Sequence, residues 1–247
     1  MAGGKYVLAS SRNPKRRRKS APKRYALASA GYGGKELKFI DSEVTSQSIV
    51  GTVTGSESDP TQDSLNGVTQ GDGESTRDGR RTYIHSVQIR GVIAFNHSQG
   101  FSTPTTDSFV RLALVLDTQT NGAQLNAEDV FKDPTNVNLD WNFLRNLSFT
   151  KRFRVLKQMD IHDENYPVGA AGDGTTNVMV AADTLRPFSI NYNFKKPVVC
   201  TYTSTSNAIS EITDNSLHLI AIEGLHSNEA STMIGELSYV SRVRFTS

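Results

Sequence analysis

Apolar and polar side chains alternate along most of the chain from residue 82 onward. The clearest case is the segment 83–95, whose predicted inward side chains are Tyr83, Val87, Ile89, Ile93 and Phe95. The same period of two recurs at 109–116, 149–161, 188–194, 197–203, 216–223 and 237–245. Because side chains in a strand point alternately to the two faces of a sheet, this period predicts half-buried β-strands.

Helical periodicity is scarce. Asn126 precedes acidic residues within 127–131, which predicts a short capped helix, and 208–213 predicts a second helical turn. The connections 118–146 and 162–184 are too long for the hairpins of an up-and-down barrel. Many strands with long crossovers predict an all-β fold, either a Greek-key sandwich or a jelly roll.

The charge is divided unevenly along the chain. Residues 1–24 hold nine Lys and Arg and no Asp or Glu, whereas the remaining 223 residues hold 18 basic and 25 acidic groups. Like charges at this density repel, and too few apolar groups accompany them to offset chain entropy. We therefore predict a disordered basic arm over 1–40 and one folded domain over 41–247. Within that domain, 48–53 reads as a short strand and 55–80 as a polar loop.

The arm offers a phosphate-binding segment. Its candidate contacts are Arg12, Lys15, Arg16, Arg17, Arg18, Lys19, Lys23 and Arg24. A polycation binds nucleic acid through counterion release and needs no fixed geometry. The run Lys15–Lys19 is also typical of a nuclear-import signal, because both uses depend on the same cations. A nuclear-import signal alone and a solvated tail are the alternatives.

A second set of basic residues falls on the predicted strands: Lys151, Arg152, Arg154, Lys157, Lys195, Lys196, Arg242 and Arg244. Residues two apart project from one face of a sheet. The set forms a patch only if the fold brings these strands together, and an ordinary solvated sheet surface is the alternative.

The sequence predicts no catalytic or metal site and no cofactor. The five histidines show no metal-ligand spacing, and the single cysteine, Cys200, lies in an apolar run typical of a core strand. His85 and His218 sit inside strand patterns and are interpreted as surface or satisfied sandwich residues. No apolar run approaches the ~18 residues of a membrane span, so we expect no membrane insertion. An enzyme or a lectin-like sandwich is the least favoured class.

Four stretches, together with the basic arm, carry a resemblance. They are RRTYIHSVQIRG at 80–91, VRLALVLDTQTNGA at 110–123, RNLSFTKRFRVL at 145–156 and NSLHLIA at 215–221. This combination looks like the capsid proteins of small circular, replication-initiator-encoding single-stranded DNA viruses, the circovirus- and geminivirus-like group. The layout is similar over the whole chain, and the distinctive stretches are 80–131 and 145–161.

The resemblance implies a single jelly roll of about eight strands in two antiparallel sheets, with sixty copies in an icosahedral shell and the arm facing inward. It also implies nucleic-acid contacts for Arg152 and Arg154, which match the basic strand of the group. The expected partners are further copies of the chain, a single-stranded DNA genome and host nuclear-import receptors. The expected locations are the virion and the host nucleus. Satellite RNA-virus capsids share the jelly roll and the arm, so an RNA genome stays open, as does a non-assembling nucleic-acid-binding jelly roll.

Overall fold

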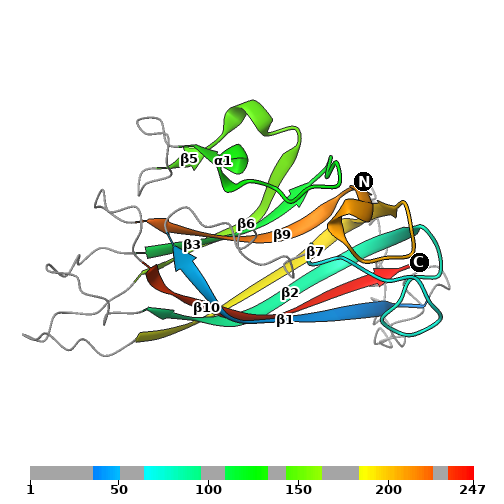
Figure 1. Ribbon diagram of the computed structural model, residues 1–247, viewed down its shortest axis with the longest axis horizontal. Coiled ribbons are helices and arrows are strands. Elements are labelled where there is room, and N and C mark those ends of the chain that lie inside the picture. The colour runs from blue at the N-terminus through cyan, green and yellow to red at the C-terminus, as the bar shows by residue number, and fades with distance from the viewer. Residues whose placement is uncertain (1–35, 51–63, 96–108, 133–142, 163–183, 225–232) are drawn as a thin grey trace, which may run out of the picture.

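The computed structural model describes residues 36–50, 64–95, 109–132, 143–162, 184–224 and 233–247 (Figure 1). The predicted arm contacts, from Arg12 to Arg24, lie outside the described residues. So do parts of the predicted polar loop and of the long connections.

The strands of the described residues form three sheets. The five-stranded sheet has the order β1 (Lys38–Val50), β10 (Met233–Thr246), β2 (Arg81–Phe95), β7 (Thr184–Tyr202) and β8 (Ile212–Asp214). The three-stranded sheet has the order β6 (Phe153–His162), β3 (Phe109–Asp117) and β9 (Ser216–Gly224). A small sheet pairs β4 (Phe131–Lys132) with β5 (Leu144–Arg145). The helical turns are α1 (Ala127–Val130), η2 (Leu147–Phe149) and η3 (Ile209–Glu211).

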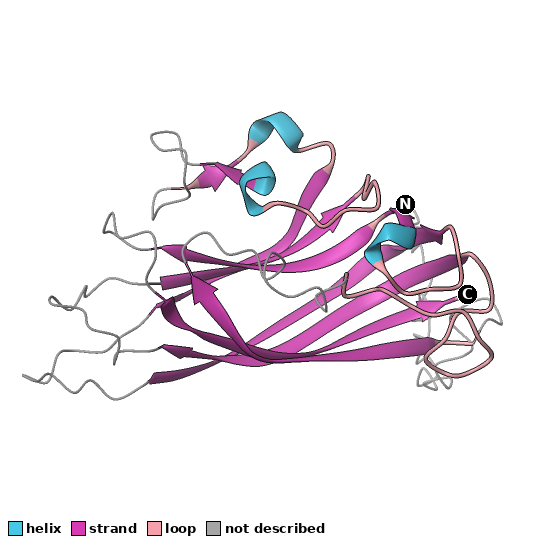
Figure 2. Cartoon of the chain, viewed as in Figure 1, coloured by secondary structure: helices cyan, strands magenta, loops and turns pink. Residues whose placement is uncertain are grey.

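The two larger sheets pack face to face, and all of their strand pairs are antiparallel (Figure 2). The chain crosses from one sheet to the other between β2 and β3, between β6 and β7, between β8 and β9, and between β9 and β10. Repeated crossing between two facing antiparallel sheets is the connectivity of a jelly roll. The predicted all-β, single jelly-roll sandwich with about eight strands in two antiparallel sheets is therefore confirmed.

Strand β2 shows how the period of two and a bulge together decide which side chains are buried. Its predicted inward side chains from Val87 to Phe95 are buried. At His85, β2 has one more residue than the facing stretch of β10. A bulge shifts the alternation by one position. As a result Ile84 is buried, and Tyr83, which we predicted to point inward, is only half-buried.

Strand β7 joins two segments, 188–194 and 197–203, that the sequence predicts as separate strands. Its pairing with β2 is interrupted over residues 194–197, which stand opposite the single residue His85. Pro197 has no N–H to donate to a ladder, and a bulge is where a strand tolerates such a residue. The prediction of two strands was therefore wrong, because the chain continues in the same direction after the bulge.

Two apolar clusters hold the layers together. The larger cluster lies between the two sheets and takes inward side chains from both. The second lies on the opposite face of the three-stranded sheet, where side chains of the connection 118–153 cover Val115 and Ile220. Within this cover, Phe131 and Phe143 meet edge to face with their ring centroids 5.6 Å apart. Figure 1 shows α1 and β5 in this cover, on the side of the three-stranded sheet away from the five-stranded sheet.

The predicted short helix is confirmed as α1. The side chain of Asn126 accepts a hydrogen bond from the Glu128 backbone N–H at 3.3 Å, which is the expected capping contact. The helical turn predicted over 208–213 begins as η3 and continues into β8.

The described part of the predicted polar loop is docked against one end of the sandwich. Arg77 is fully buried there. Its Nε donates to the carbonyl of Val68 at 2.8 Å, and its two terminal nitrogens donate to the carbonyls of Gly79 and Ser204. The guanidinium carbon lies 4.2 Å from the ring centroid of Tyr202. One buried cation thus joins two segments that are far apart in the sequence.

The first strand begins inside the segment that we assigned to the arm. Strand β1 pairs with β10 from Lys38 onward, before the predicted boundary between 40 and 41. The Lys38 side chain is 5% exposed, and its Nζ forms an ion pair with Asp78 in the docked loop. A partnered lysine can be buried, so its charge did not mark the end of the folded part.

Candidate nucleic-acid interface

Of the residues that we predicted to contact nucleic acid, Arg152 and Arg154 are described. They lie at the start of β6 and two residues apart, but their surroundings differ. Arg154 is exposed, and it forms no ion pair within the described ranges. Arg152 is half-buried and directed at a carboxylate.

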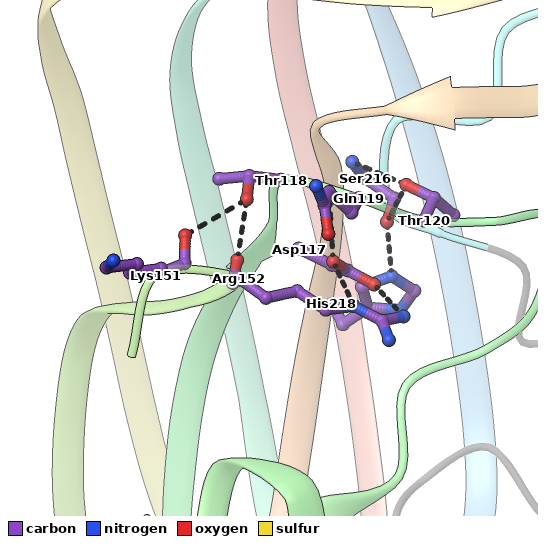
Figure 3. Close-up of polar contacts among 8 residues, drawn as sticks. All are labelled: Asp117, Thr118, Gln119, Thr120, Lys151, Arg152, Ser216 and His218. Atoms are coloured by element: carbon purple, nitrogen blue, oxygen red, sulfur yellow. Dashed lines mark hydrogen bonds and ion pairs between the residues drawn. The ribbon is translucent and has the colours of Figure 1, made fainter. Parts of the chain in front are cut away.

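Arg152 forms a two-point ion pair with Asp117 at the end of β3 (Figure 3). Its Nε and one terminal nitrogen each donate to a different carboxylate oxygen at 3.0 Å. The Asp117 side chain is 0% exposed, whereas that of Arg152 is 28% exposed. The hydrogen bond with Asp117 raises the pKa of Arg152. The cation of Arg152 is therefore used to neutralise a buried charge.

Backbone contacts strengthen this corner of the fold. The carbonyl of Arg152 accepts from the N–H of Thr118 at 2.9 Å and from its hydroxyl at 3.0 Å. The N–H of Gln119 donates to the Asp117 carboxylate at 2.9 Å. Together these bonds fasten the end of the covering connection to the end of β3. Arg152 therefore has a structural function, and Arg154 is the more exposed of the two arginines. That either residue contacts nucleic acid stays a prediction.

A serine and a histidine lie beside this ion pair. The hydroxyl of Ser216 is 2.8 Å from Nε2 of His218, and the Thr120 hydroxyl donates to Ser216 at 2.8 Å (Figure 3). Burial lowers the pKa of His218 to about 4, with the Asp117 charge opposing the shift. His218 is therefore neutral at pH 7, and its Nε2 shares a hydrogen bond with the Ser216 hydroxyl.

A serine next to a histidine is also the arrangement of an activated nucleophile. Here the side chains of Ser216 and Thr120 are 0% exposed, so neither hydroxyl meets solvent. Each makes a hydrogen bond to a neighbour, and the chain of bonds ties the first residue of β9 to the covering connection. The interpretation of His218 as a satisfied sandwich residue is confirmed. Among the described residues there is also no group of three or more His, Cys, Asp or Glu side chains placed to hold a metal ion.

The fold divides the second basic set between the two sheets. Lys151, Arg152, Arg154 and Lys157 lie in or next to β6, at an edge of the three-stranded sheet. The other members lie on β7 and β10 of the five-stranded sheet, where β2 separates the two strands. The set therefore does not form one patch.

The basic residues on the five-stranded sheet differ in whether they form an ion pair. Arg242 donates from Nε to the Asp41 carboxylate at 2.7 Å, and its guanidinium carbon lies 4.7 Å from the ring centroid of Phe39. Lys195 and Lys196 are exposed in the β7 bulge. These two lysines form no ion pair with any described residue.

Sequence reasoning missed the burial of the charged residues Asp117 and Arg77. Asp117 directly follows an apolar run, and a carboxylate at the end of a buried strand was the available signal for it. Arg77 gave no signal, because it lies in a polar stretch that resembles an exposed loop.

Comparison of the chain with known protein families and with curated proteins found no match. No helix in the described part of the chain has the length and apolarity that a membrane span requires.

Proposed function

We propose that this protein is a viral capsid subunit that self-assembles into a small icosahedral shell and packages single-stranded DNA through its basic arm. The observation that carries the proposal is that a strongly basic segment precedes a jelly-roll domain in the same chain. A segment with nine basic residues and no acidic ones, 1–24, precedes a jelly roll whose first strand begins at Lys38. That strand, β1, lies at the edge of the five-stranded sheet.

The charge distribution supports separate tasks for the arm and the body. Residues 41–247 carry 16 basic and 24 acidic groups, a net charge of −8. A body of this charge repels phosphates over most of its surface, whereas the arm attracts them at any sequence. The arm therefore binds the genome and the body forms the shell. The run Lys15–Lys19 would also direct the newly made subunit to the host nucleus through an import receptor.

The strand register supports a surface for subunit contacts. Phe109 pairs with both His162 and Gly224, and Phe95 pairs with Thr184. These strand ends therefore lie together at one end of the sandwich. An end of a sandwich where several strands finish can take part in subunit contacts in a symmetric assembly.

The proposal is tested by the mass and content of the purified full-length protein. Sixty subunits of 27.0 kDa give particles of about 1.6 MDa, measured by size-exclusion chromatography with light scattering and by negative-stain microscopy. We expect such particles to contain nuclease-protected single-stranded DNA. Protected RNA would instead support the satellite-like alternative. A monomer that binds nucleic acid without forming particles would reject the shell.

A further inference from the structure

The outer face of the five-stranded sheet is uncovered in the part of the chain that the structure describes. The outer face of the three-stranded sheet is packed against α1 and the rest of the covering connection. No described element lies on the other side of the five-stranded sheet (Figure 1). Its central strands instead expose polar side chains, including Ser189, Asn191 and Asn193 of β7.

The two central strands of this sheet lack acidic residues. Strand β2 has 15 residues and β7 has 19, and neither contains an Asp or a Glu. Acidic residues make up 25 of the 247 in the whole chain, so about three would be expected in 34 residues. The same strands contain five basic residues, Arg81, Arg90, Arg186, Lys195 and Lys196, of which Arg186 pairs with the buried Ile93 and so belongs to the inner face. This part of a net-negative body therefore has the opposite charge to its surroundings.

Several cations of this face form no close ion pair with a described residue, although the hydrogen bond of Arg242 and, to a smaller extent, the charge of Arg244 lower the pKa of Asp41. Arg90 is exposed at the middle of β2, and Lys195 and Lys196 are exposed in the β7 bulge. Arg244 of β10 is half-buried. Within the described ranges these side chains form no ion pair.

The register places these cations on one surface. Ser86 of β2 pairs with Asn193 on one side and with Arg244 on the other. Arg244, Ser86 and Asn193 therefore form a row across the three strands. Lys195 lies two residues beyond Asn193, in the β7 bulge. Arg90 lies four residues along β2 from this row, which is about 14 Å at ~3.4 Å per residue. Cations about 14 Å apart can contact different phosphates of one nucleic-acid strand, whereas they are too far apart to bind the same small anion.

The acidic residues of the same face lie mainly at its margin. Asp41 and Glu43 belong to the edge strand β1, and Arg242 already neutralises Asp41. Glu236 pairs with Ala94 near the far end of β2. The area between them, over β2 and β7, is positive and bears amide and hydroxyl groups that can donate hydrogen bonds to phosphate or base oxygens.

We propose that this outer face, over β2, β7 and the adjoining part of β10, is a second binding surface for single-stranded nucleic acid. Arg90, Arg244, Lys195 and Lys196 contact phosphates, and the amides of Gln88 and Asn191 donate hydrogen bonds between them. The inference rests on the proposed function and adds the orientation of the subunit: this face of the sandwich meets the packaged strand.

The test compares two pairs of exposed lysines in the full-length protein. One variant, Lys195→Gln with Lys196→Gln, changes the proposed surface. The control, Lys132→Gln with Lys151→Gln, removes the same charge from the opposite side of the molecule. Binding of a short oligothymidine strand is measured against salt concentration. Each lost phosphate contact lowers the slope of log affinity against log salt by about 0.7.

We expect the surface variant to lower that slope by about 1.4 and to weaken binding about tenfold near physiological salt. Adding Arg90→Gln should lower the slope by about 2.1 in total. The control should change the slope by less than half as much as the surface variant. As a second measurement on the unmutated protein, oligothymidine should protect Lys195 and Lys196 from acetylation and leave Lys132 and Lys151 reactive.

Equal slopes for the surface variant and the control would overturn the inference. So would a surface variant that no longer forms particles while its slope is unchanged, because the face would then contact another copy of the chain. Failure of the shell proposal looks different. If the unmutated protein forms no particles but the slopes differ as expected, the binding surface stands and the capsid assignment is rejected.

Discussion

Arg77 and Asp117 are both fully buried, yet they are neutralised in different ways. Asp117 faces a guanidinium, whereas Arg77 faces carbonyl oxygens and the ring of Tyr202. Burial lowers the pKa of Arg77, and the nearby Tyr202 opposes the shift. Each residue joins two segments of the chain. Removing either side chain leaves its partner groups, the carbonyls around Arg77 or the guanidinium beside Asp117, without a hydrogen-bond partner.

Substitution Arg77→Met should destabilise the fold by about 3 kcal/mol or more, because it leaves several buried carbonyls without donors at about 1–3 kcal/mol each. The matched control is Arg81→Met, since Arg81 is exposed. The control should change stability by less than about 0.5 kcal/mol. Urea unfolding measures both free energies. Equal values for the two variants would show that the buried guanidinium is dispensable.

Substitution Arg152→Met should be costly for a different reason. It leaves the Asp117 carboxylate buried without its cation, which costs about 3–5 kcal/mol. Arg154→Met, two residues away and exposed, should change stability by less than about 0.5 kcal/mol. Comparing the two variants by thermal melting separates a structural arginine from one available to a phosphate. A stable Arg152→Met protein with reduced nucleic-acid binding would contradict the structural role and support the predicted nucleic-acid contact of Arg152.

His218 should make stability depend on pH. Its pKa is lowered from 6.5 to about 4 in the folded protein, so the unfolded chain binds more protons between these values. The contribution of His218 to stability should be nearly constant well above pH 6.5 and fall by about 2 kcal/mol between pH 6.5 and pH 5, at ~1.36 kcal/mol per unit. His218→Gln should lack this part of the pH dependence. Urea unfolding of both proteins at pH 7, 6 and 5 gives the difference, and parallel curves would refute the assignment.

At the scale of secondary-structure elements, the period of two located the long strands of the five-stranded sheet because their apolar side chains face one side only. Strands β3 and β9 were also located, although they are buried on both faces rather than half-buried as predicted. The departures have local causes. Tyr83 was misplaced because the bulge at His85 reverses the alternation, and a bulge leaves no fixed mark in a single sequence. The strand over 184–202 was divided in two because Pro197 usually ends a strand, whereas here a bulge accommodates it.

Charged residues were harder to place than apolar ones, because the sequence gives their type but not their partners. Arg152 and Arg154 look equivalent in the pattern, and only the fold brings Asp117 to one of them. The boundary of the arm was set too late for the same reason, since Lys38 counted as an arm charge until its pairing with Asp78 was seen. Arg90, which we propose as a binding residue, drew no notice in the sequence because no other Lys or Arg lies within eight positions of it.

The arm should be separable from the jelly roll. Deleting residues 1–24 should leave the melting temperature unchanged, because β1 begins only at Lys38, and should abolish nucleic-acid packaging. The measurements are thermal melting and the nucleic-acid content of purified particles. The full-length protein is the control. A large loss of stability, or an unchanged nucleic-acid content, would refute the separation of tasks.

At the scale of the whole molecule, positive charge is concentrated in two places. One is the arm, with nine cations in residues 1–24. The other is the uncovered face of the five-stranded sheet, whose central strands contain no carboxylate. The rest of the body is net negative. If both places meet the same polyanion, the subunit has a defined inner side, and the acidic part of its surface remains for contacts with other subunits and with solvent.

Assembly should therefore depend on the polyanion. In a shell of sixty subunits the arms bring 540 positive charges together, nine from each copy. Their repulsion opposes closure at low salt unless phosphates neutralise them, and each nucleotide supplies about one negative charge, so roughly five hundred nucleotides would balance the arms. A longer genome needs further cations, and the sheet face supplies some of them.

We expect nuclease-treated full-length subunits to form shells readily when single-stranded DNA is added and poorly without it at low salt. Subunits that lack residues 1–24 should assemble to the same extent in both conditions, because their contacts come from the jelly roll alone. Light scattering follows the reaction, and raising the salt concentration should reduce the difference for the full-length protein by screening the arms. Equal assembly of full-length subunits with and without DNA at low salt would refute the electrostatic argument, because the arms would then close into a shell without neutralisation.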